Sequence, residues 1–278
     1  MAKTPPYPFI KWAGGKARMA KHVIKRLPEE INTYYEPLVG GGAVYFELAK
    51  KEKFKRAILA DTSPELVNTW NIIKKDVENL IKELRKAKYE YEKKAFLSIR
   101  ALDLNDLNNI QRAARFIYLN KTCFNGLYRV NLKGQFNTPF GKYKNPVICD
   151  ANNLKAVSKC LKKTTIKKAD FAKVCQKAKA GDAVYFDPPY IPISKTSKFT
   201  SYTTNRFIDE DHDRLAKLFR ELGDKGVRVV LSNSSAPYAI KIFKDFDIDH
   251  LIGTRSIGGP AEYRNSAKEI LVFHGPRA

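Results

Sequence analysis

The chain has 278 residues, of which 51 are Lys or Arg and 29 are Asp or Glu, so its formal charge at pH 7 is +22. Chains of this length form one large domain or two unequal ones, and they build a core without disulfide bonds or a structural metal. The sequence holds no run of about 18 apolar residues, which excludes a membrane span, and the start of the chain lacks the apolar run of a signal peptide. We therefore expect a cytoplasmic protein.

The four cysteines and four histidines have none of the spacings that are typical of zinc ligands, so we expect no metal site and no disulfide framework. The basic excess is more informative. A folded chain with a sequence pI near 9.7 attracts polyanions, of which nucleic acid is the simplest. A general surplus of lysine that serves solubility is the alternative.

The first 61 residues have the pattern strand, glycine turn, helix, strand. Residues 34–39 and 56–61 are short apolar runs, each ending in a glycine turn or a carboxylate, and residues 42–50 have helical spacing. Such a βαβ unit is typical of a doubly wound, mostly parallel sheet, so we assign the chain to the α/β class.

Between residues 64 and 149 the pattern changes to charged helices, which include a helix over 109–120. The alternation then resumes, with strands predicted over 165–171, 183–187, 227–233 and 267–273, and helices over 171–182 and 209–222. Gly223 is expected to end the second of these helices. The sheet is thus interrupted by a mainly helical insertion, which divides the chain into a domain of residues 1–63 and 150–278 and a domain of residues 64–149.

A glycine turn, EPLVGGG, follows the first strand over residues 36–42, and Asp61 ends the next strand. Glycines allow a ligand to approach the backbone and the start of the helix closely. An acid about 20 residues further on, at the tip of the second strand, suits ribose hydroxyls. A tight turn without a ligand is the alternative for the glycines alone, but Asp61 favours a nucleoside site.

The apolar strand AVYF leads directly into Asp187, Pro188, Pro189 and Tyr190. Two prolines donate no ladder hydrogen bond, so the chain leaves the sheet at its carboxyl edge, where sites in such folds lie. An exocyclic amine on a nucleobase is a poor nucleophile, because its lone pair is delocalised into the ring. The Asp187 carboxylate and the Pro188 carbonyl can accept its two N–H groups and free the lone pair, while Tyr190 stacks on the base. An ordinary turn is the alternative.

With these motifs the chain resembles the Dam-type adenine-N6 DNA methyltransferases, the alpha group of the D12 class. The resemblance covers nearly the whole chain through FIKWAGGK, EPLVGGG, LADTSPEL, FNGLYRVNLKGQFNTPFGKY and DPPYIPISKTSKFTSY. One departure is Leu38, where the family usually has Phe, and it should alter packing beside the cofactor. The resemblance implies a Rossmann-like methyltransferase fold, in which residues 1–63 and 150–278 are catalytic and residues 64–149 recognise the DNA target.

The resemblance also implies S-adenosylmethionine as methyl donor, S-adenosylhomocysteine as product, direct transfer and no metal. Trp12 and Lys16 would line the methionine end, Asp61 would bind the ribose, and Asp170 and Phe171 would lie near the adenine ring. The implied cofactor-binding residues are Trp12, Gly15, Lys16, Glu36, Pro37, Gly40, Gly42, Asp61, Asp170, Phe171 and Asp187. The implied catalytic residues are Asp187, Pro188, Pro189 and Tyr190.

Residues 120–145 hold five basic residues and no acid, with Phe, Tyr and Asn interleaved. The runs YRVN and QFNTPF flank a turn at residues 132–134, which predicts a β-hairpin. A hairpin can enter the major groove of DNA, where arginine pairs with both acceptors of guanine. A solvated basic hairpin is the alternative.

The resemblance implies that Leu127 and Arg129 read bases in double-stranded DNA, and the implied site is GATC. Phe124 and Asn125 would fill the gap left by a flipped adenine. The remaining implied DNA contacts are Lys11, Lys133, Pro139, Tyr143 and, in the loop after the Asp-Pro-Pro-Tyr motif, Lys198. That loop is interpreted as a phosphate-contacting lid, with an ordinary surface loop as the alternative.

Two other functions remain open. The first is S-adenosylmethionine-dependent methylation of RNA adenine or protein glutamine, although Asp rather than Asn at position 187 disfavours glutamine, and the hairpin disfavours RNA. The second is a non-catalytic DNA-binding module, which the intact glycine turn, Asp61 and the residues 187–190 disfavour. We expect a monomeric, site-specific adenine DNA methyltransferase.

Overall fold

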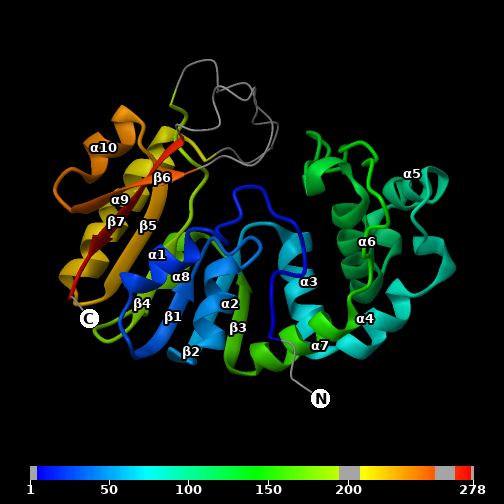
Figure 1. Ribbon diagram of the computed structural model, residues 1–278, viewed down its shortest axis with the longest axis horizontal. Coiled ribbons are helices and arrows are strands. Elements are labelled where there is room, and N and C mark those ends of the chain that lie inside the picture. Colours follow the sequence, from blue (N-terminus) through cyan, green and yellow to red (C-terminus); the bar gives the residue numbers. More distant parts are fainter. Residues whose placement is uncertain (1–4, 194–206, 254–266, 277–278) are drawn as a thin grey trace.

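The computed structural model describes residues 5–193, 207–253 and 267–276. In these ranges, seven strands form one sheet in the order β3-β2-β1-β4-β5-β7-β6 (Figure 1). The strands are β1 Ile31–Glu36, β2 Phe54–Asp61, β3 Thr164–Lys168, β4 Ala183–Phe186, β5 Arg228–Ser234, β6 Asp247–Gly253 and β7 Ala267–His274. Neighbours are parallel from β3 to β5, whereas β7 is antiparallel to β5 and β6. The predicted mostly parallel α/β sheet is confirmed; β6 was not predicted.

Helices cover both faces of this sheet. They are α1 Ala20–Lys25, α2 Ala43–Lys50, α3 Pro64–Lys75, α4 Val77–Leu84, α5 Lys93–Ala101, α6 Asn109–Thr122, α7 Ala151–Cys160, α8 Phe171–Cys175, α9 Asp209–Asp224 and α10 Pro237–Phe243. One hydrophobic cluster packs α1, α2 and α3 on one face, and a second packs α8, α9 and α10 on the other. Sequence patterns did not predict α1, α7 or α10.

The central strand β4 is apolar and buried along its length, because successive side chains point to opposite faces and both faces are covered. In β1, Tyr34 belongs to the cluster under α2 and α3, whereas Tyr35 belongs to the cluster under α8 and α9. Val184 and Tyr185 of β4 divide in the same way. The central strands are therefore held rigidly, and so are the residues that follow them.

The predicted helices of the insertion are confirmed, and α4, α5 and α6 lie beside α3, away from the sheet (Figure 1). Helix α3 contacts β2 and β3 as well as α6. A single hydrophobic cluster runs from the sheet through Trp70 to Phe116 and Phe96. The assignment of residues 64–149 to a separate recognition domain stays a prediction, since the core continues across that boundary.

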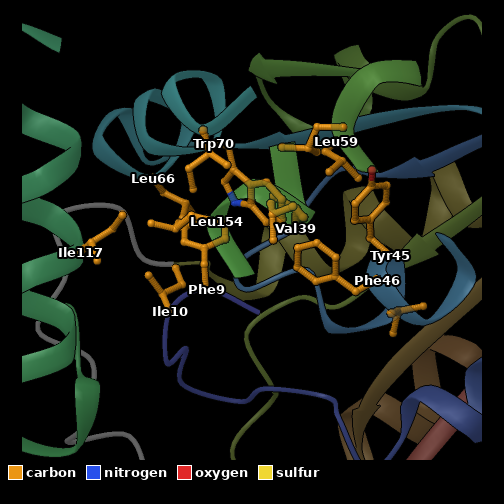
Figure 2. Packing of buried hydrophobic residues seen from close by; sticks show 14 of the residues in the cluster. Phe9, Ile10, Val39, Tyr45, Phe46, Leu59, Leu66, Trp70, Ile117 and Leu154 are labelled. Carbon is orange, nitrogen blue, oxygen red and sulfur yellow. The ribbon is translucent and has the colours of Figure 1, made fainter. Parts of the chain in front are cut away.

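The tryptophan at the centre of this cluster supports the glycine turn after β1. Trp70 is fully buried, with Phe9 edge-on at 4.8 Å and Phe46 stacked at 5.6 Å between ring centroids. Figure 2 shows these rings close to Val39, which precedes the glycines. The turn therefore rests on a packed aromatic layer.

The predicted β-hairpin is wrong in extent. The segment folds back on itself, but its antiparallel pairing is limited to two isolated bridges, Val130–Phe136 and Cys123–Phe140. One reason is that the Asn131 side chain accepts the backbone N–H groups of Lys133 and Gln135, at 3.0 Å each. Another is that Pro139 has no N–H to donate. The Asn131 side chain thus takes the Gln135 N–H, while backbone hydrogen bonds such as Asn137 N–H to the Arg129 carbonyl remain.

The role predicted for Gly223 is also wrong. Helix α9 continues to Asp224, and the glycine with left-handed backbone is Gly226, at φ 81°. A Cβ at Gly223 would lie 2.0 Å from Cδ2 of His274 on β7. Glycine is needed at this position for close packing of the helix on the sheet.

No helix in the described ranges is long and apolar enough to cross a membrane.

Candidate active site

The predicted cofactor and catalytic residues meet at one edge of the sheet, because the carboxyl ends of parallel strands all lie there. The glycine turn follows β1, Asp61 ends β2, Asp170 follows β3 and Asp187 follows β4. Ser232, near the end of β5, lies in the adjacent strand.

The glycine turn is shaped for close approach. Gly40 and Gly42 have left-handed backbone, with φ of 48° and 69°. A Cβ at Gly40 would lie 2.5 Å from Cδ1 of Trp12, and one at Gly42 would lie 2.8 Å from Trp70. Trp70 Nε1 also donates to the Gly40 carbonyl at 3.2 Å. Only glycine fits at these two positions.

Asp61 braces the turn. Its Oδ2 accepts the Gly40 N–H at 3.2 Å, and its Oδ1 accepts the Ser63 N–H at 2.9 Å. Burial raises the pKa of the Asp61 carboxyl, and these backbone donors oppose the rise. A carboxylate oxygen has room for a second hydrogen bond, so both oxygens can still accept from a ligand hydroxyl.

Lys16 and Asp187 form a partly buried ion pair between segments that lie far apart in the chain. Lys16 Nζ is 3.0 Å from Asp187 Oδ1, donates to the Gly14 carbonyl at 2.5 Å, and lies 4.4 Å from the centre of the Tyr190 ring. The Lys16 side chain is 8% exposed and the Asp187 side chain 22%. Lys16 thus holds the Oδ1 oxygen of the carboxylate, while part of the Asp187 side chain stays exposed.

Ser232 adds a second donor to the same carboxylate oxygen, with its Oγ 2.7 Å from Asp187 Oδ1. Burial raises the pKa of the Asp187 carboxyl, and Lys16 and Ser232 oppose that rise. In the Asp-Pro-Pro-Tyr motif itself, Pro188 is buried, Pro189 is exposed and Tyr190 is half-buried. Tyr190 therefore keeps part of its side chain exposed, next to Lys16 and Asp187.

Glu36 lies beneath the site at the end of β1 and precedes Pro37. It is 2% exposed, and Tyr34 donates a hydrogen bond of 2.7 Å to its Oε2. Burial raises the pKa of Glu36 to about 8, and the charge of Asp187 contributes to the rise. This carboxyl is held inside the fold rather than on the open side of the turn.

Asp170 and Phe171 lie at the start of α8. The Asp170 side chain caps the helix by accepting the Ala172 N–H at 2.9 Å, and it pairs with Arg214 of α9, also at 2.9 Å. The Arg214 guanidinium lies 4.8 Å from the centre of the buried Phe171 ring. The Ala169 N–H bonds to the Asp61 carbonyl at 3.3 Å, so this pair is adjacent to the turn.

A buried asparagine joins the glycine-rich N-terminal segment to the predicted DNA-contacting segment. Asn120 accepts the Lys11 N–H at 2.9 Å and donates to the carbonyls of Lys11 and Gly126, at 2.7 and 2.9 Å. Lys11 Nζ lies 3.7 Å from the centre of the Tyr143 ring. Lys11 and Tyr143, both predicted to contact DNA, are therefore neighbours. Trp12 packs between the glycine turn and Tyr128, with 6.5 Å between ring centroids.

The remaining predicted DNA contacts lie on one folded-back segment. Phe124 and Leu127 are 51% and 39% exposed, Asn125 has a left-handed φ of 53°, and Pro139 accepts the Phe124 N–H at 2.8 Å. Arg129 is held by Asn137, since its Nε donates to the Asn137 Oδ1 at 2.7 Å. Lys133 is exposed at the tip. Lys198 lies outside the described residues, as does the rest of the predicted lid over 194–207 except its last residue, Phe207.

Sequence reasoning missed Ser232, Asn120, Asn137 and Arg214. For Ser232 a signal was present, because a polar run, Ser-Asn-Ser-Ser, ends an apolar strand. Asn120 and Arg214 act through contacts between distant segments, which no local pattern reveals, and Asn137 acts within the folded-back segment, on Arg129. In the part of the chain that the structure describes, no three His, Cys, Asp or Glu side chains gather so as to hold a metal ion.

Known proteins are similar to this chain over most of its length. A family model for the D12 class of N6 adenine-specific DNA methyltransferases matches residues 12–257. The chain is 43% identical over 271 residues to the Type II methyltransferase M1.LlaDCHI of Lactococcus lactis subsp. cremoris, which covers 95% of this chain and 94% of that protein. It is 43% identical over 284 residues to the Type II methyltransferase M.MjaIII of Methanocaldococcus jannaschii, covering 96% and 98%. To the DNA adenine methylase of Escherichia coli K12 it is 30% identical over 270 residues, covering 96% and 95%.

Proposed function

Since the chain belongs to the D12 class of N6 adenine-specific DNA methyltransferases, we propose that it methylates N6 of an adenine flipped out of duplex DNA, within the site GATC, in the cytoplasm. The observation that carries the proposal is the position of Asp187 and the hydrogen bonds that its carboxylate accepts. Two donors hold one oxygen of its carboxylate at the carboxyl edge of the sheet, next to the half-buried Tyr190.

The residues at this edge fit S-adenosylmethionine. The glycine turn packs so closely on Trp12 and Trp70 that no Cβ fits at Gly40 or Gly42, and Asp61 beside it has acceptor capacity for the ribose hydroxyls. Asp170 and Phe171 lie next to that turn, where an adenine ring would be held. When bound, this cofactor supplies a methyl carbon on a positively charged sulfur. The carboxylate of Asp187 would favour that charge.

The chain's own groups would activate the target amine. The Asp187 Oδ2 and the Pro188 carbonyl would each accept one N–H of the exocyclic amine, which draws the nitrogen towards tetrahedral geometry and frees its lone pair. After attack, the same Oδ2 would take the proton that the nitrogen loses. Tyr190 would stack on the flipped base, and the two prolines limit reorganisation of the loop.

Most of the proposed DNA contacts lie on the segment after α6, which Asn120 links to Lys11 by hydrogen bonds. The half-exposed Phe124 would fill the space left by the flipped adenine and offset part of the unstacking free energy. Arg129, with its guanidinium plane held by Asn137, would read a guanine, and Leu127 would contact a neighbouring base. Pro139 and Tyr143 would support these readers, while Lys133 and Lys198 would bind phosphates.

The deciding experiment is transfer of a tritium-labelled methyl group from S-adenosylmethionine to two duplexes, one with a single GATC and one with GTTC in its place. Label in the first duplex only, recovered as N6-methyladenine, is the expected result. Equal label in both would remove the GATC assignment and keep the enzyme.

Label in neither duplex, with the cofactor still bound, would overturn the proposal and favour RNA adenine or protein glutamine as the substrate. The negative control is Asp187→Ala, which should still bind the duplex but transfer no methyl group. Substantial transfer by this variant would contradict the proposed role of the carboxylate.

A further inference from the structure

Strand β5 ends in three consecutive polar residues that are fully buried. Ser232 and Asn233 have no exposed surface, and Ser234 is 1% exposed. All three side chains bond to the residues of the loop that follows β4, or to each other's backbone. Burial of three polar side chains in a row lowers stability unless their hydrogen bonds are made, so their presence at this position calls for a role.

Ser232 holds the near end of the loop. Its single proton is directed to Asp187 Oδ1 at 2.7 Å, and its Oγ lies 2.9 Å from the Tyr185 hydroxyl. Because an ionised carboxylate has no proton to donate, Ser232 must donate to Asp187, and Tyr185 must donate to Ser232. The result is a directed chain of hydrogen bonds that runs from a fully buried tyrosine to the carboxylate.

Asn233 and Ser234 hold the far end of the same loop. The Asn233 Oδ1 accepts the Ile191 N–H at 3.0 Å, and Ser234 Oγ donates to the Ile191 carbonyl at 2.5 Å. Within the described ranges, the Asn233 Nδ2 has no hydrogen-bond partner. The hydrogen bonds that Asn233 does make fix the backbone at Ile191 and at Ser234.

We propose that Ser232 is a positioning residue for methyl transfer, which orients the Asp187 carboxylate so that Oδ2, and not Oδ1, meets the target amine. Ser232 and Lys16 both bond to Oδ1, and no other residue of the described ranges bonds to the carboxylate. Two donors on one oxygen stop the carboxylate from turning about its own axis. The inference rests on the proposed function, since it needs Asp187 to accept the amine.

The role differs from simple structural support in two measurable ways. If the carboxylate can turn, Oδ2 is in position to accept the amine N–H for less of the time. The chemical step then becomes slower, while cofactor and DNA binding stay intact. Loss of the Ser232 donor also removes one of the two groups that favour the ionised form of Asp187, so the pKa of Asp187 should rise further. The titratable groups around Asp187 in the described ranges are Lys16 before α1, Tyr34 and Glu36 of β1, Tyr185 of β4 and Tyr190 of the loop, and Glu269 of β7 acts on Tyr190.

The experiment compares Ser232→Ala, Ser232→Thr and Tyr185→Phe in the full chain. Single-turnover methylation of the GATC duplex should be about 10- to 100-fold slower in Ser232→Ala, and its acid limb should move to higher pH. The dissociation constants for S-adenosylmethionine and for DNA should change less than about threefold, which is within the effect of an ordinary surface substitution. Ser232→Thr keeps the hydroxyl and should restore the rate, and Tyr185→Phe should cause a smaller loss.

The matched control is Ser158→Ala, another serine-to-alanine change, on α7. Among the described residues, its hydroxyl bonds only to the Lys74 carbonyl. It should leave the rate and the pH profile at the wild-type values. A second readout needs no substrate: the pKa of Asp187, from carboxyl carbon-13 shifts, should be higher in Ser232→Ala than in the wild type.

An active wild type whose Ser232→Ala variant keeps the wild-type rate and the wild-type Asp187 pKa would overturn the positioning role. So would a Ser232→Thr variant that keeps the wild-type stability and is as slow as Ser232→Ala. If the wild type itself transfers no methyl group to DNA, the proposed function fails. The carbon-13 measurement then reports separately whether Ser232 controls the carboxylate.

Discussion

At the scale of single residues, the site contains two neighbouring carboxyl groups, Asp187 and Glu36, whose surroundings differ. Asp187 has a lysine and a serine on one oxygen, which favour its ionised form against burial. Glu36 is more deeply buried and accepts its side-chain hydrogen bond from Tyr34 rather than from a basic group, and burial raises its pKa to about 8. Two neighbouring acids whose pKa values are set by different surroundings are typical of catalytic sites.

Glu36 predicts a pH dependence of stability. Its pKa is about 8 in the folded chain against 4.5 for the free group, so between these values the folded state binds one more proton than the unfolded state. The stability that Glu36 contributes is therefore complete below pH 4.5 and is lost as the pH rises through 8. Glu36→Gln has no proton to lose.

Urea unfolding of the wild type and of Glu36→Gln at several pH values between 5 and 9 tests this. The free energy of unfolding of the variant, relative to the wild type, should increase with pH. Glu47→Gln, on the partly exposed face of α2, is the control and should show no such trend. Parallel pH profiles for the wild type and Glu36→Gln would refute the assignment.

At the scale of elements, the turn after β1 and the folded-back segment after α6 differ in what defines their shape. The glycine turn is defined by what lies against it, because Trp12 and Trp70 leave no room for a side chain at Gly40 or Gly42. The segment after α6 is defined by its own side chains, with Asn131 and Asn137 taking backbone and guanidinium donors. Substitutions in the two elements should therefore have different consequences.

Gly40→Ala should be more destabilising than Gly134→Ala. Both residues have left-handed backbone, which costs a non-glycine residue about 1–2 kcal/mol, and their φ angles are 48° and 75°. A Cβ at Gly134 has nothing within 4 Å, whereas one at Gly40 would lie 2.5 Å from the Trp12 ring. Overpacking of this kind adds roughly 1–3 kcal/mol.

Chemical unfolding and calorimetric titration with S-adenosylmethionine measure both effects. Gly40→Ala should lose stability by roughly the sum of the strain and overpacking terms and should bind the cofactor more weakly. Gly134→Ala should show the strain alone, with wild-type cofactor affinity. Equal losses of stability in the two variants would mean that the Trp12 side chain moves to make room for the extra methyl group.

Arg129→Ala should relax sequence preference more than it weakens DNA binding. A bidentate arginine contact to guanine is worth about 1–3 kcal/mol of discrimination, which is roughly 5- to 150-fold in the ratio of rates for GATC and a site with one changed base. Asn137→Ala should lower the same ratio by less, since it only frees the guanidinium plane. Methylation rates on both duplexes test this, and an unchanged ratio in Arg129→Ala would show that another residue reads the base.

At the scale of the whole molecule, the charge of +22 has to be divided between a DNA-facing region and the rest of the surface. Many basic groups are held by acids away from the site, for example Arg220 by Asp245 and Lys155 by Glu78. Lys133 is exposed at the tip of the predicted DNA-contacting segment, and Lys179 is exposed at the opposite edge of the sheet, just before β4. Substituting each lysine in turn therefore distinguishes a local contact with DNA from the effect of the overall charge.

Lys133→Ala should weaken binding to cognate and unrelated duplexes alike, and it should reduce the slope of log affinity against log salt concentration by about 1, because one phosphate contact is lost. Lys179→Ala removes the same charge and should leave the slope unchanged. Fluorescence anisotropy between low and moderate salt provides both slopes. Equal slopes for all three proteins would remove Lys133 from the interface.

The sequence by itself determined the α/β class, the glycine turn, Asp61 and the loop that starts at Asp187, because each depends on a local pattern that parallel strands bring to one edge. Patterns were weaker where side chains replace ladder bonds, as at Asn131, and where a glycine serves packing, as Gly223 does. Only the tertiary structure decided that Ser232 holds Asp187, 45 positions away, and that Asn120 holds Lys11, 109 positions away. Such pairs depend on which strands are neighbours and on how α6 packs, and those arrangements are fixed by the burial of the whole chain rather than by any segment of it.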